Sequence, residues 1–163
     1  MSTRRSAGLL LHRQRQGRVQ VLLVHMGGPF WAGRDAGAWS LPKGEHAETE
    51  DALAAARREF VEETGLQVPP GVPVELGELR QSSGKLVRAW ALQADVDVGE
   101  ITSNTFTMEW PRGSGRVGEF PEVDRAQWFD TEDARQKLVK GQVPFLDALQ
   151  RVLADARPMR PGG

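Results

Sequence analysis

A short glutamate-rich segment contains the residues of this sequence that are best suited to chemistry. It reads RREFVEETGL from Arg57 to Leu66 and includes Glu59, Glu62 and Glu63. On an α-helix, residues three and four positions apart are neighbours, so these carboxylates would share adjoining parts of one face. Their mutual repulsion is relieved when a hard divalent cation such as Mg²⁺ binds the carboxylate oxygens. A solvated helix surface is the alternative, and the segment alone leaves both interpretations open.

The stretch at residues 49–64 has the pattern of a helix that would position these glutamates. It contains neither Pro nor Gly, is rich in alanine, and places apolar side chains on one face. We expect Thr49 to be the N-cap of this helix and Gly65 to end it. Because the apolar face adjoins the glutamates, we expect Glu59 and Glu63 to point toward a sheet or a cleft.

The frame around the segment is more specific than the segment itself. Reading from Gly44, five residues lead to Glu50, seven more lead to Arg58 and Glu59, and the remaining specified positions follow within residues 60–66. This pattern resembles the Nudix box of the Nudix hydrolases, G-x5-E-x7-R-E-U-x-E-E-x-G-U, in which U is a bulky apolar residue. Every specified position is filled, and a match of this length and spacing is highly specific.

The resemblance extends over most of residues 6–129. SAGLLL looks like the first strand of the family, AWSLPKGE looks like the approach to the box, and EVDRAQWF looks like the downstream segment in which a glutamate precedes an aromatic strand. The resemblance implies an α/β fold, the Nudix-type α/β/α sandwich around a mixed β-sheet. It also implies a pyrophosphohydrolase that depends on Mg²⁺ or Mn²⁺. Such an enzyme would cleave a phosphoanhydride bond of a nucleoside polyphosphate or dinucleoside polyphosphate. Family substrates have the general form of a nucleoside diphosphate linked to a group X.

The resemblance assigns metal-binding roles to residues of the box. Glu62 and Glu63 would bind the metal ion, and Gly44 would offer its backbone carbonyl to it. Glu59 would be either a third ligand or the base that activates the attacking water. These roles agree with the ability of a bound metal to acidify water and to offset charge on a leaving phosphate.

Three further residues complete the expected site. Arg58 would be one of the catalytic residues, and it would pair with Glu50 and so hold the loop and the helix of the box together. Lys43 would contact the polyphosphate of the substrate, with a plain solvated lysine as the alternative. Glu122, six residues before Trp128, would be a metal ligand or a base, as a glutamate at this place is in many family members.

Substrate choice has weaker signals. The tripeptide PKG at residues 42–44 resembles the diadenosine polyphosphate hydrolase branch more than the PGG form of MutT-like enzymes. The chain has no tyrosine, so the tyrosine stacking of some diadenosine polyphosphate hydrolases has no counterpart here. Other aromatic residues are candidates to stack on a base, with core packing the alternative for each. They are Phe30, Trp31, Trp39, Trp90, Phe106 and Trp110.

The first part of the chain predicts strands. Apolar runs at residues 7–13 and 19–26 flank a polar turn that contains Gly17, so we expect a β-hairpin. A brief strand is expected within residues 38–45, where Pro42 stops it.

The middle of the chain predicts further strands and one long loop. Residues 74–81 and 85–96 have the composition of strands joined at the turn SSG, and residues 105–110 form a short additional one. Residues 111–129, rich in Gly and Pro, predict a long loop that ends in a short strand at 126–129.

The end of the chain predicts helices. Thr131 is the expected cap of a helix at residues 132–140, and Pro144 is expected to open another that continues through 145–156. Residues 157–163 read as a frayed tail.

Length and composition limit the remaining choices. With 163 residues the chain has the size of one domain, and we expect a single domain, 1–163, with an ordered core at about 6–156. The 21 Lys and Arg residues nearly balance the 22 Asp and Glu residues, which argues against nucleic acid as a partner. No segment has the length of a signal-peptide core or a membrane span, so no membrane partner is expected.

The absence of cysteine excludes disulfides, thiolate metal sites and a cysteine nucleophile, and it fits a cytoplasmic protein. The expected partner is a small-molecule nucleotide substrate, and a homodimer is one oligomeric state that the sequence leaves open. A nucleotide-binding sensor or regulator without turnover is the alternative function. The completely filled box favours the enzyme, because a degenerate site would be expected to lose a glutamate.

Overall fold

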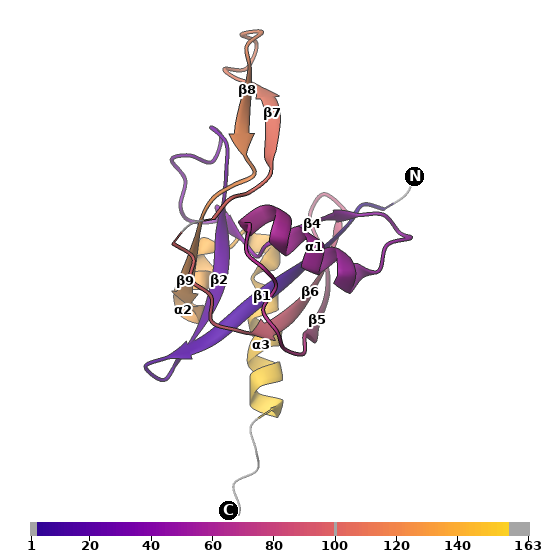
Figure 1. The fold of residues 1–163 in the computed structure, drawn as a ribbon, viewed down its shortest axis with the longest axis vertical. Helices are drawn as coiled ribbons and strands as arrows, with labels where there is room; N and C mark the ends of the chain where they lie inside the picture. The colour runs from indigo at the N-terminus through magenta and orange to yellow at the C-terminus, as the bar shows by residue number, and fades with distance from the viewer. Residues whose placement is uncertain (1–2, 100, 157–163) are drawn as a thin grey trace, which may run out of the picture.

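The computed structural model describes residues 3–99 and 101–156 and shows a mixed α/β fold (Figure 1). The tail predicted at residues 157–163 lies outside the described residues. In chain order the elements are β1 (Arg5–Arg15), β2 (Arg18–Met26), β3 (Trp39–Ser40), β4 (Lys43–His46), α1 (Ala52–Thr64), β5 (Val74–Arg80), β6 (Leu86–Gln93), β7 (Thr105–Glu109), β8 (Val117–Pro121), β9 (Val123–Asp130), α2 (Thr131–Lys137), a 3-10 turn (Lys140–Gln142) and α3 (Pro144–Asp155).

Seven strands of the described residues form one mixed sheet with the order β3-β2-β1-β6-β5 along its main path. β1 is antiparallel to β2, which confirms the predicted first hairpin, and parallel to β6. β4 pairs with β1, and β9 pairs with β2. β5 and β6 are antiparallel neighbours, as their predicted turn requires.

Helices cover both faces of this sheet, as Figure 1 shows, with α1 on one side and α2 and α3 on the other. Successive side chains of β1 alternate between the two faces. Leu10 packs in the same cluster as Phe145 and its neighbours from α3, whereas Leu9 and Leu11 pack in the cluster that contains Phe60 of α1. The expected α/β/α sandwich around a mixed sheet is therefore confirmed.

Backbone and side-chain capping set the ends of α1. Gly65 ends the helix in the left-handed conformation with φ of 73°, as predicted. The predicted N-cap Thr49 is wrong, because a turn at residues 47–50 delays the start of the helix. Asp51 is the N-cap instead, and its Oδ2 accepts a hydrogen bond of 3.0 Å from the amide of Ala54.

The brief strand predicted within residues 38–45 is divided in two at Pro42. Before the proline, β3 pairs with β2, and after it β4 pairs with β1. Proline has no amide hydrogen for a strand ladder, so the chain changes pairing partner at this point. The division matters for the site because it brings Lys43 and Gly44 onto a strand beside α1.

The long loop predicted at residues 111–129 is wrong. Within it β8 forms an antiparallel hairpin with β7, and β9 begins at Val123 instead of at residue 126. Glycine and proline in VGEFP hid the strand alternation, and pairing with a distant strand overrides that local signal. Figure 1 shows the β7–β8 hairpin standing away from the main sheet at the top of the view.

The C-terminal helices follow the predictions in part. α2 begins at Thr131, but the predicted cap is wrong, since Asp130 takes the N-cap position without a side-chain hydrogen bond. The helix also ends at Lys137, before the predicted end. α3 opens at Pro144 as predicted. Among the described residues, the helices are too short or too polar to cross a membrane.

Candidate functional site

One pocket of about 510 Å³ brings together most of the residues predicted for the site. Its walls come from α1, β4, the end of β2 and the segments that precede β7 and β9. Arg58 is the one residue predicted for the site that does not line this pocket. The predicted residues that line the pocket are Lys43, Gly44, Glu59, Glu62, Glu63 and Glu122.

Glu59 lies directly against Gly44. The residue is only 8% exposed, and a Cβ atom on Gly44 would lie 1.9 Å from Glu59 Oε2 and 2.0 Å from its Cδ. Real Cβ atoms do not approach other atoms so closely, so a side chain at position 44 would displace the carboxylate. The predicted orientation of Glu59 toward the sheet is thus confirmed.

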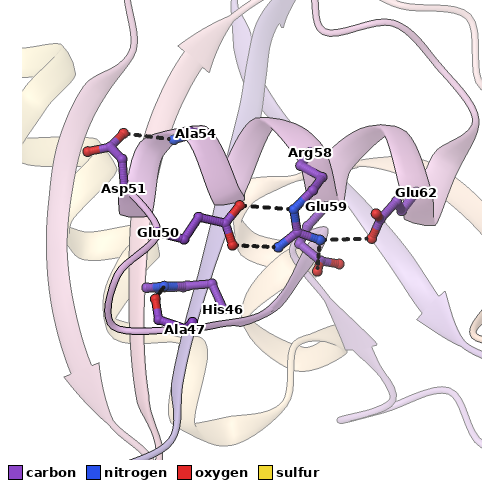
Figure 2. Close-up of polar contacts among 8 residues, drawn as sticks. All are labelled: His46, Ala47, Glu50, Asp51, Ala54, Arg58, Glu59 and Glu62. Atoms are coloured by element: carbon purple, nitrogen blue, oxygen red, sulfur yellow. Dashed lines mark hydrogen bonds and ion pairs between the residues drawn. The ribbon is translucent and has the colours of Figure 1, made fainter.

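Arg58 holds three carboxylates at once (Figure 2). Its Nε and Nη2 donate to the two oxygens of Glu50 at 3.0 Å each, which confirms the predicted pair. Its Nη1 donates to Glu59 at 2.9 Å and to Glu62 at 3.1 Å. These carboxylates, Glu50 foremost, raise the pKa of Arg58 above its usual value. The bidentate contact joins the loop before α1 to the helix itself.

Glu63 connects the last turn of α1 to β4. Its Oε2 accepts a hydrogen bond of 3.1 Å from the backbone amide of Lys43. Burial raises the pKa of the Glu63 carboxyl to about 8. Burial also lowers the pKa of the Lys43 side chain, and the nearby charge of Lys85 lowers it further. The structure therefore places Glu63 beside the backbone of Lys43, with both residues half-buried.

The other carboxylates of the pocket repel one another. Burial raises the pKa of Glu59, and the charge of Glu62 raises it further, while Arg58 opposes both effects. The pKa of Glu122 is raised by the same two causes, burial first and the charge of Glu62 second. Within residues 3–99 and 101–156, no three acidic, histidine or cysteine side chains converge as they stand into a group that could hold a metal ion. Arg58 draws Glu59 and Glu62 toward itself in this arrangement.

A row of backbone hydrogen bonds positions Glu122 relative to α1. The amide of Asn104 donates to the carbonyl of Glu62 at 2.9 Å, and the amide of Glu122 donates to the carbonyl of Asn104 at 2.8 Å. The amide of Gly27 then donates to the carbonyl of Glu122 at 2.9 Å. The first bond satisfies a carbonyl that the helix end leaves free. We refer to these three bonds, which run from Glu62 to Gly27, as the backbone row.

His25 fastens the loop after β2 to β9 near Glu122. The side chain is fully buried. Its Nδ1 lies 2.9 Å from a carboxylate oxygen of Asp124, and its Nε2 lies 2.7 Å from the carbonyl oxygen of Arg34. Because a carbonyl only accepts, Nε2 is the donor of the second bond. His25 therefore has a structural role.

The aromatic candidates divide into two groups. Trp39 and Trp90 are buried in the core, at 2% and 6% exposure. The other four line a second cavity of about 580 Å³, which adjoins the first. They are Phe30, Trp31, Phe106 and Trp110.

Two cationic residues of the pocket were missed by the sequence analysis. Arg4 and Lys85 line it together with Lys43. Glu45 interacts with both, at 2.6 Å from Arg4 and 3.7 Å from Lys85. Neither residue belongs to a motif, and only the pairing of β1 with β4 and with β6 brings them to this place. No signal in the sequence could have identified them.

Comparisons with known proteins are consistent with this fold. The structure resembles a C. elegans Ap4A hydrolase in a binary complex, with a TM-score of 0.66 and 22% identity over 92% of this chain and 98% of that chain. It also resembles the NUDIX domain of Shewanella oneidensis NrtR complexed with ADP ribose, with a TM-score of 0.65 and 17% identity over 94% of this chain and 90% of that chain. At such identities the likeness shows the fold alone.

A search among curated proteins found no match to the chain. The family model described as the NUDIX domain, however, matches residues 2–149, which is most of the sequence. The match includes the complete box, and the four box residues Gly44, Glu59, Glu62 and Glu63 line one pocket. The chain belongs to the NUDIX domain family.

Proposed function

We propose that this protein is a metal-dependent pyrophosphohydrolase that cleaves a phosphoanhydride bond of a nucleoside polyphosphate or dinucleoside polyphosphate. The observation that carries the proposal is the pocket that five glutamates, four of them predicted for the site, line together with three basic side chains. Carboxylates suit a divalent cation, whereas the basic side chains suit the phosphate oxygens of a substrate. The names of two similar structures, an Ap4A hydrolase and a domain complexed with ADP ribose, support this substrate class.

The chemistry of the donor set fits Mg²⁺ or Mn²⁺. The proposed ligands offer only oxygen atoms, which hard cations prefer. Burial and mutual repulsion raise the pKa of Glu59 and Glu122, and burial raises that of Glu63, so a bound cation would offset an existing electrostatic cost. When bound, it would acidify a water molecule and offset charge on the leaving phosphate. The proposed ligands are the carbonyl of Gly44 and the carboxylates of Glu59, Glu62, Glu63 and Glu122.

Glu59 and Glu122 are the two proposed acceptors for the proton of the attacking water. Both have a raised pKa, which brings a carboxylate closer to the pH at which a general base is most effective. Glu59 is held by Arg58 and Gly44, whereas Glu122 is exposed on the segment before β9. Comparison of the pH dependence of kcat in Glu59→Gln and Glu122→Gln identifies the base, because its loss removes the acidic limb.

Lys43 is the proposed contact for the substrate phosphates, together with Arg4 and Lys85. All three line the pocket of about 510 Å³ that contains the glutamates, which we call the carboxylate pocket. Lys43 is partly buried, whereas Arg4 is exposed, so the charge of Lys43 would act on a phosphate with less screening than that of Arg4. Lys43→Gln is therefore expected to raise KM more than it lowers kcat.

The proposal is tested by hydrolysis of a substrate panel with Mg²⁺, Mn²⁺ or EDTA. The panel includes diadenosine tetraphosphate, ADP-ribose, common and oxidised nucleoside triphosphates, sugar nucleotides and inositol polyphosphates. Identification of the products reports which phosphorus is attacked. Glu62→Gln is the control for metal-site chemistry, and its rate of hydrolysis should be lower by orders of magnitude. Tight nucleotide binding without turnover would instead establish the sensor or regulator function.

We further propose that the chain acts as a single domain, 1–163, in the cytoplasm. The lack of cysteine supports a reducing compartment. Light scattering coupled to size-exclusion chromatography distinguishes a monomer from a homodimer.

A further inference from the structure

The hairpin of β7 and β8 is a sheet of its own. Its five residue pairs run from Thr105 with Pro121 to Glu109 with Val117, and neither strand pairs with the main sheet among the described residues. Figure 1 shows it extending away from the body of the molecule. A sheet of only two strands is marginally stable in water, and further strands stabilise it. The hairpin therefore has an energetic reason to accept another strand.

The hydrogen-bond pattern shows which backbone groups of β7 are available to such a strand. Next to its two ends, the amide of Glu122 donates to the carbonyl of Asn104 and the amide of Trp110 donates to the carbonyl of Arg116, both at 2.8 Å. In an antiparallel pair, bonded positions alternate with positions whose backbone groups point away from the partner strand. The odd-numbered residues of β7, which are exposed, therefore direct their amides and carbonyls outward.

The outer edge of β7 lacks the features that usually prevent strands from associating. Natural edges are blunted by lysine, proline, charged side chains or bulges. The sequence of β7, TFTME, has no proline, glycine or basic residue and is rich in residues that favour strands. By contrast, β5 at one end of the main sheet carries three charged side chains and an irregular register between Glu75 and Gly77. The edge of β5 is thus blunted, whereas that of β7 is open.

The sequence of β7 is complementary to itself. When two copies pair antiparallel along the whole strand, Thr107 lies opposite Thr107 and Phe106 lies opposite Met108. Cross-strand threonine pairs and pairs of large apolar side chains stabilise a sheet. The one charged residue of the strand, Glu109, lies opposite the neutral Thr105. The backbone groups of Thr107 point outward, so this register uses groups that β8 leaves unbonded.

The other edge of the hairpin is unsuited to the same pairing. Two antiparallel copies of β8 would place Glu119 opposite Glu119, and like charges in direct opposition destabilise a sheet. Pro121 also removes an amide from that edge. A two-fold axis through β7 therefore gives an assembly that closes at two copies.

The charges at the two ends of the hairpin are complementary in this arrangement. The turn at residues 110–116 contains Arg112 and Arg116 and no acidic residue. The base of the hairpin is attached through Asn104 to Glu62 and Glu122 of the carboxylate pocket. Because the paired strands run in opposite directions, the basic turn of each copy would lie beside the acidic base of the other.

We propose that β7 pairs with β7 of a second copy of this chain, so that the two hairpins form one four-stranded antiparallel sheet across a two-fold axis. Thr107 lies at the centre of the interface. The proposal is independent of any enzymatic activity. One strand pair is a small contact for a dimer, so association should depend on protein concentration.

Sedimentation velocity over a range of protein concentrations tests the proposal. The average mass of the wild type should rise from that of one chain toward that of two. Thr107→Pro removes an outward amide from each copy, so dimerisation should weaken about 30-fold, as the loss of two backbone hydrogen bonds implies. Glu119→Pro is the matched control, because Glu119 lies opposite Thr107 and its amide points out of the other edge. Its dimerisation should equal that of the wild type.

Cysteine cross-linking tests the register even if a proline disturbs the hairpin. The chain contains no cysteine, so one introduced thiol reports a single position. In the proposed pairing the two Cα atoms of residue 107 lie about 5.5 Å apart, within the usual range for a disulfide. Thr107→Cys should form a covalent dimer under mild oxidation, whereas Glu119→Cys at the same concentration should remain uncrosslinked.

A wild type that stays monomeric at every concentration would overturn the proposal and leave the edge of β7 to a different partner. Dimers that persist unchanged in Thr107→Pro, or that cross-link equally through Thr107→Cys and Glu119→Cys, would place the interface elsewhere and also overturn it.

Discussion

The carboxylate of Glu59 occupies the space that a side chain on Gly44 would need, with 1.9 Å between the position of a Cβ atom and Glu59 Oε2. Gly44 does not have a positive φ, so the glycine is required by this contact and not by backbone strain. Gly44→Ala should displace Glu59 and lower kcat/KM by about 100-fold, as a misplacement of roughly 1 Å can do.

Gly33→Ala is the matched control for this substitution. No atom lies within 4 Å of the position that a Cβ on Gly33 would take, so its activity should equal that of the wild type. Steady-state kinetics on the best substrate of the panel measures both variants. Wild-type kcat/KM in Gly44→Ala would contradict the importance of the contact.

Arg58 is expected to set the pH range of activity through Glu59. Its hydrogen bond and charge lower the pKa of Glu59 against the raising effect of burial. Arg58→Gln removes this opposition, so the pKa of Glu59 rises and the carboxylate loses its proton only at higher pH. If Glu59 is the base, the acidic limb of the kcat/KM profile should move to higher pH.

The neighbouring Arg57 provides the control, because it is exposed on α1. Arg57→Gln should leave the position of the acidic limb unchanged. A limb that stays in place or moves to lower pH in Arg58→Gln would count against Glu59 as the base and favour Glu122.

Glu63 is expected to lower the stability of the metal-free fold as pH rises. Burial raises the pKa of Glu63 to about 8 in the folded state, against about 4.3 in an unfolded chain. Between these pH values the folded form retains a proton that the unfolded form has lost, so the free energy of unfolding falls as pH rises. Glu63→Gln removes this titration and should be the more stable protein near pH 8 in EDTA, with little difference below pH about 4.

Urea unfolding across this pH range measures the effect. Glu48→Gln, at an exposed position before α1, retains Glu63 and should show the same fall in the free energy of unfolding with pH as the wild type. Saturating Mg²⁺ should stabilise the wild type more than Glu63→Gln, since a ligand that binds only the folded state raises its stability. The same pH dependence in wild type and Glu63→Gln would contradict the assignment.

His25 should contribute to stability through its two part-buried polar contacts. His25→Ala leaves the carbonyl of Arg34 and the carboxylate of Asp124 without this partner, at a cost of about 1–3 kcal/mol for each polar group that stays buried. His46→Ala should have a smaller effect, because the contact of His46 with Ala47 is exposed. Denaturant midpoints compare the two variants, and equal losses would contradict a special role for His25.

The sequence predicted the elements whose signals are local. Gly65 ended α1 as expected because only its own left-handed conformation was needed. The pair of Arg58 with Glu50 followed from the resemblance to the Nudix box. The N-cap was assigned to Thr49 instead of Asp51, since both residue types can cap a helix and the preceding turn decides between them.

Long-range pairing accounts for most of what the sequence did not predict. β8 acquires its strand structure by pairing with β7 across a turn rich in glycine. Arg4 and Lys85 lie at the carboxylate pocket only because β1 pairs with β4 and with β6. The position of Glu122 beside Glu62 depends on the amide and carbonyl of Asn104, and backbone groups are common to every residue, so no side-chain pattern could reveal them.

The backbone row from Glu62 to Gly27 also determines how this part of the molecule opens. Asn104 precedes the hairpin that carries Phe106 and Trp110, and Gly27 begins the loop that carries Phe30. A substrate held in the pocket, which Gly27, Asn104 and Glu122 all line, would restrain both ends of the row. The amides of Gly27, Asn104 and Glu122 should then exchange with deuterium as one cooperative unit, and all three should slow together when a nucleotide is added.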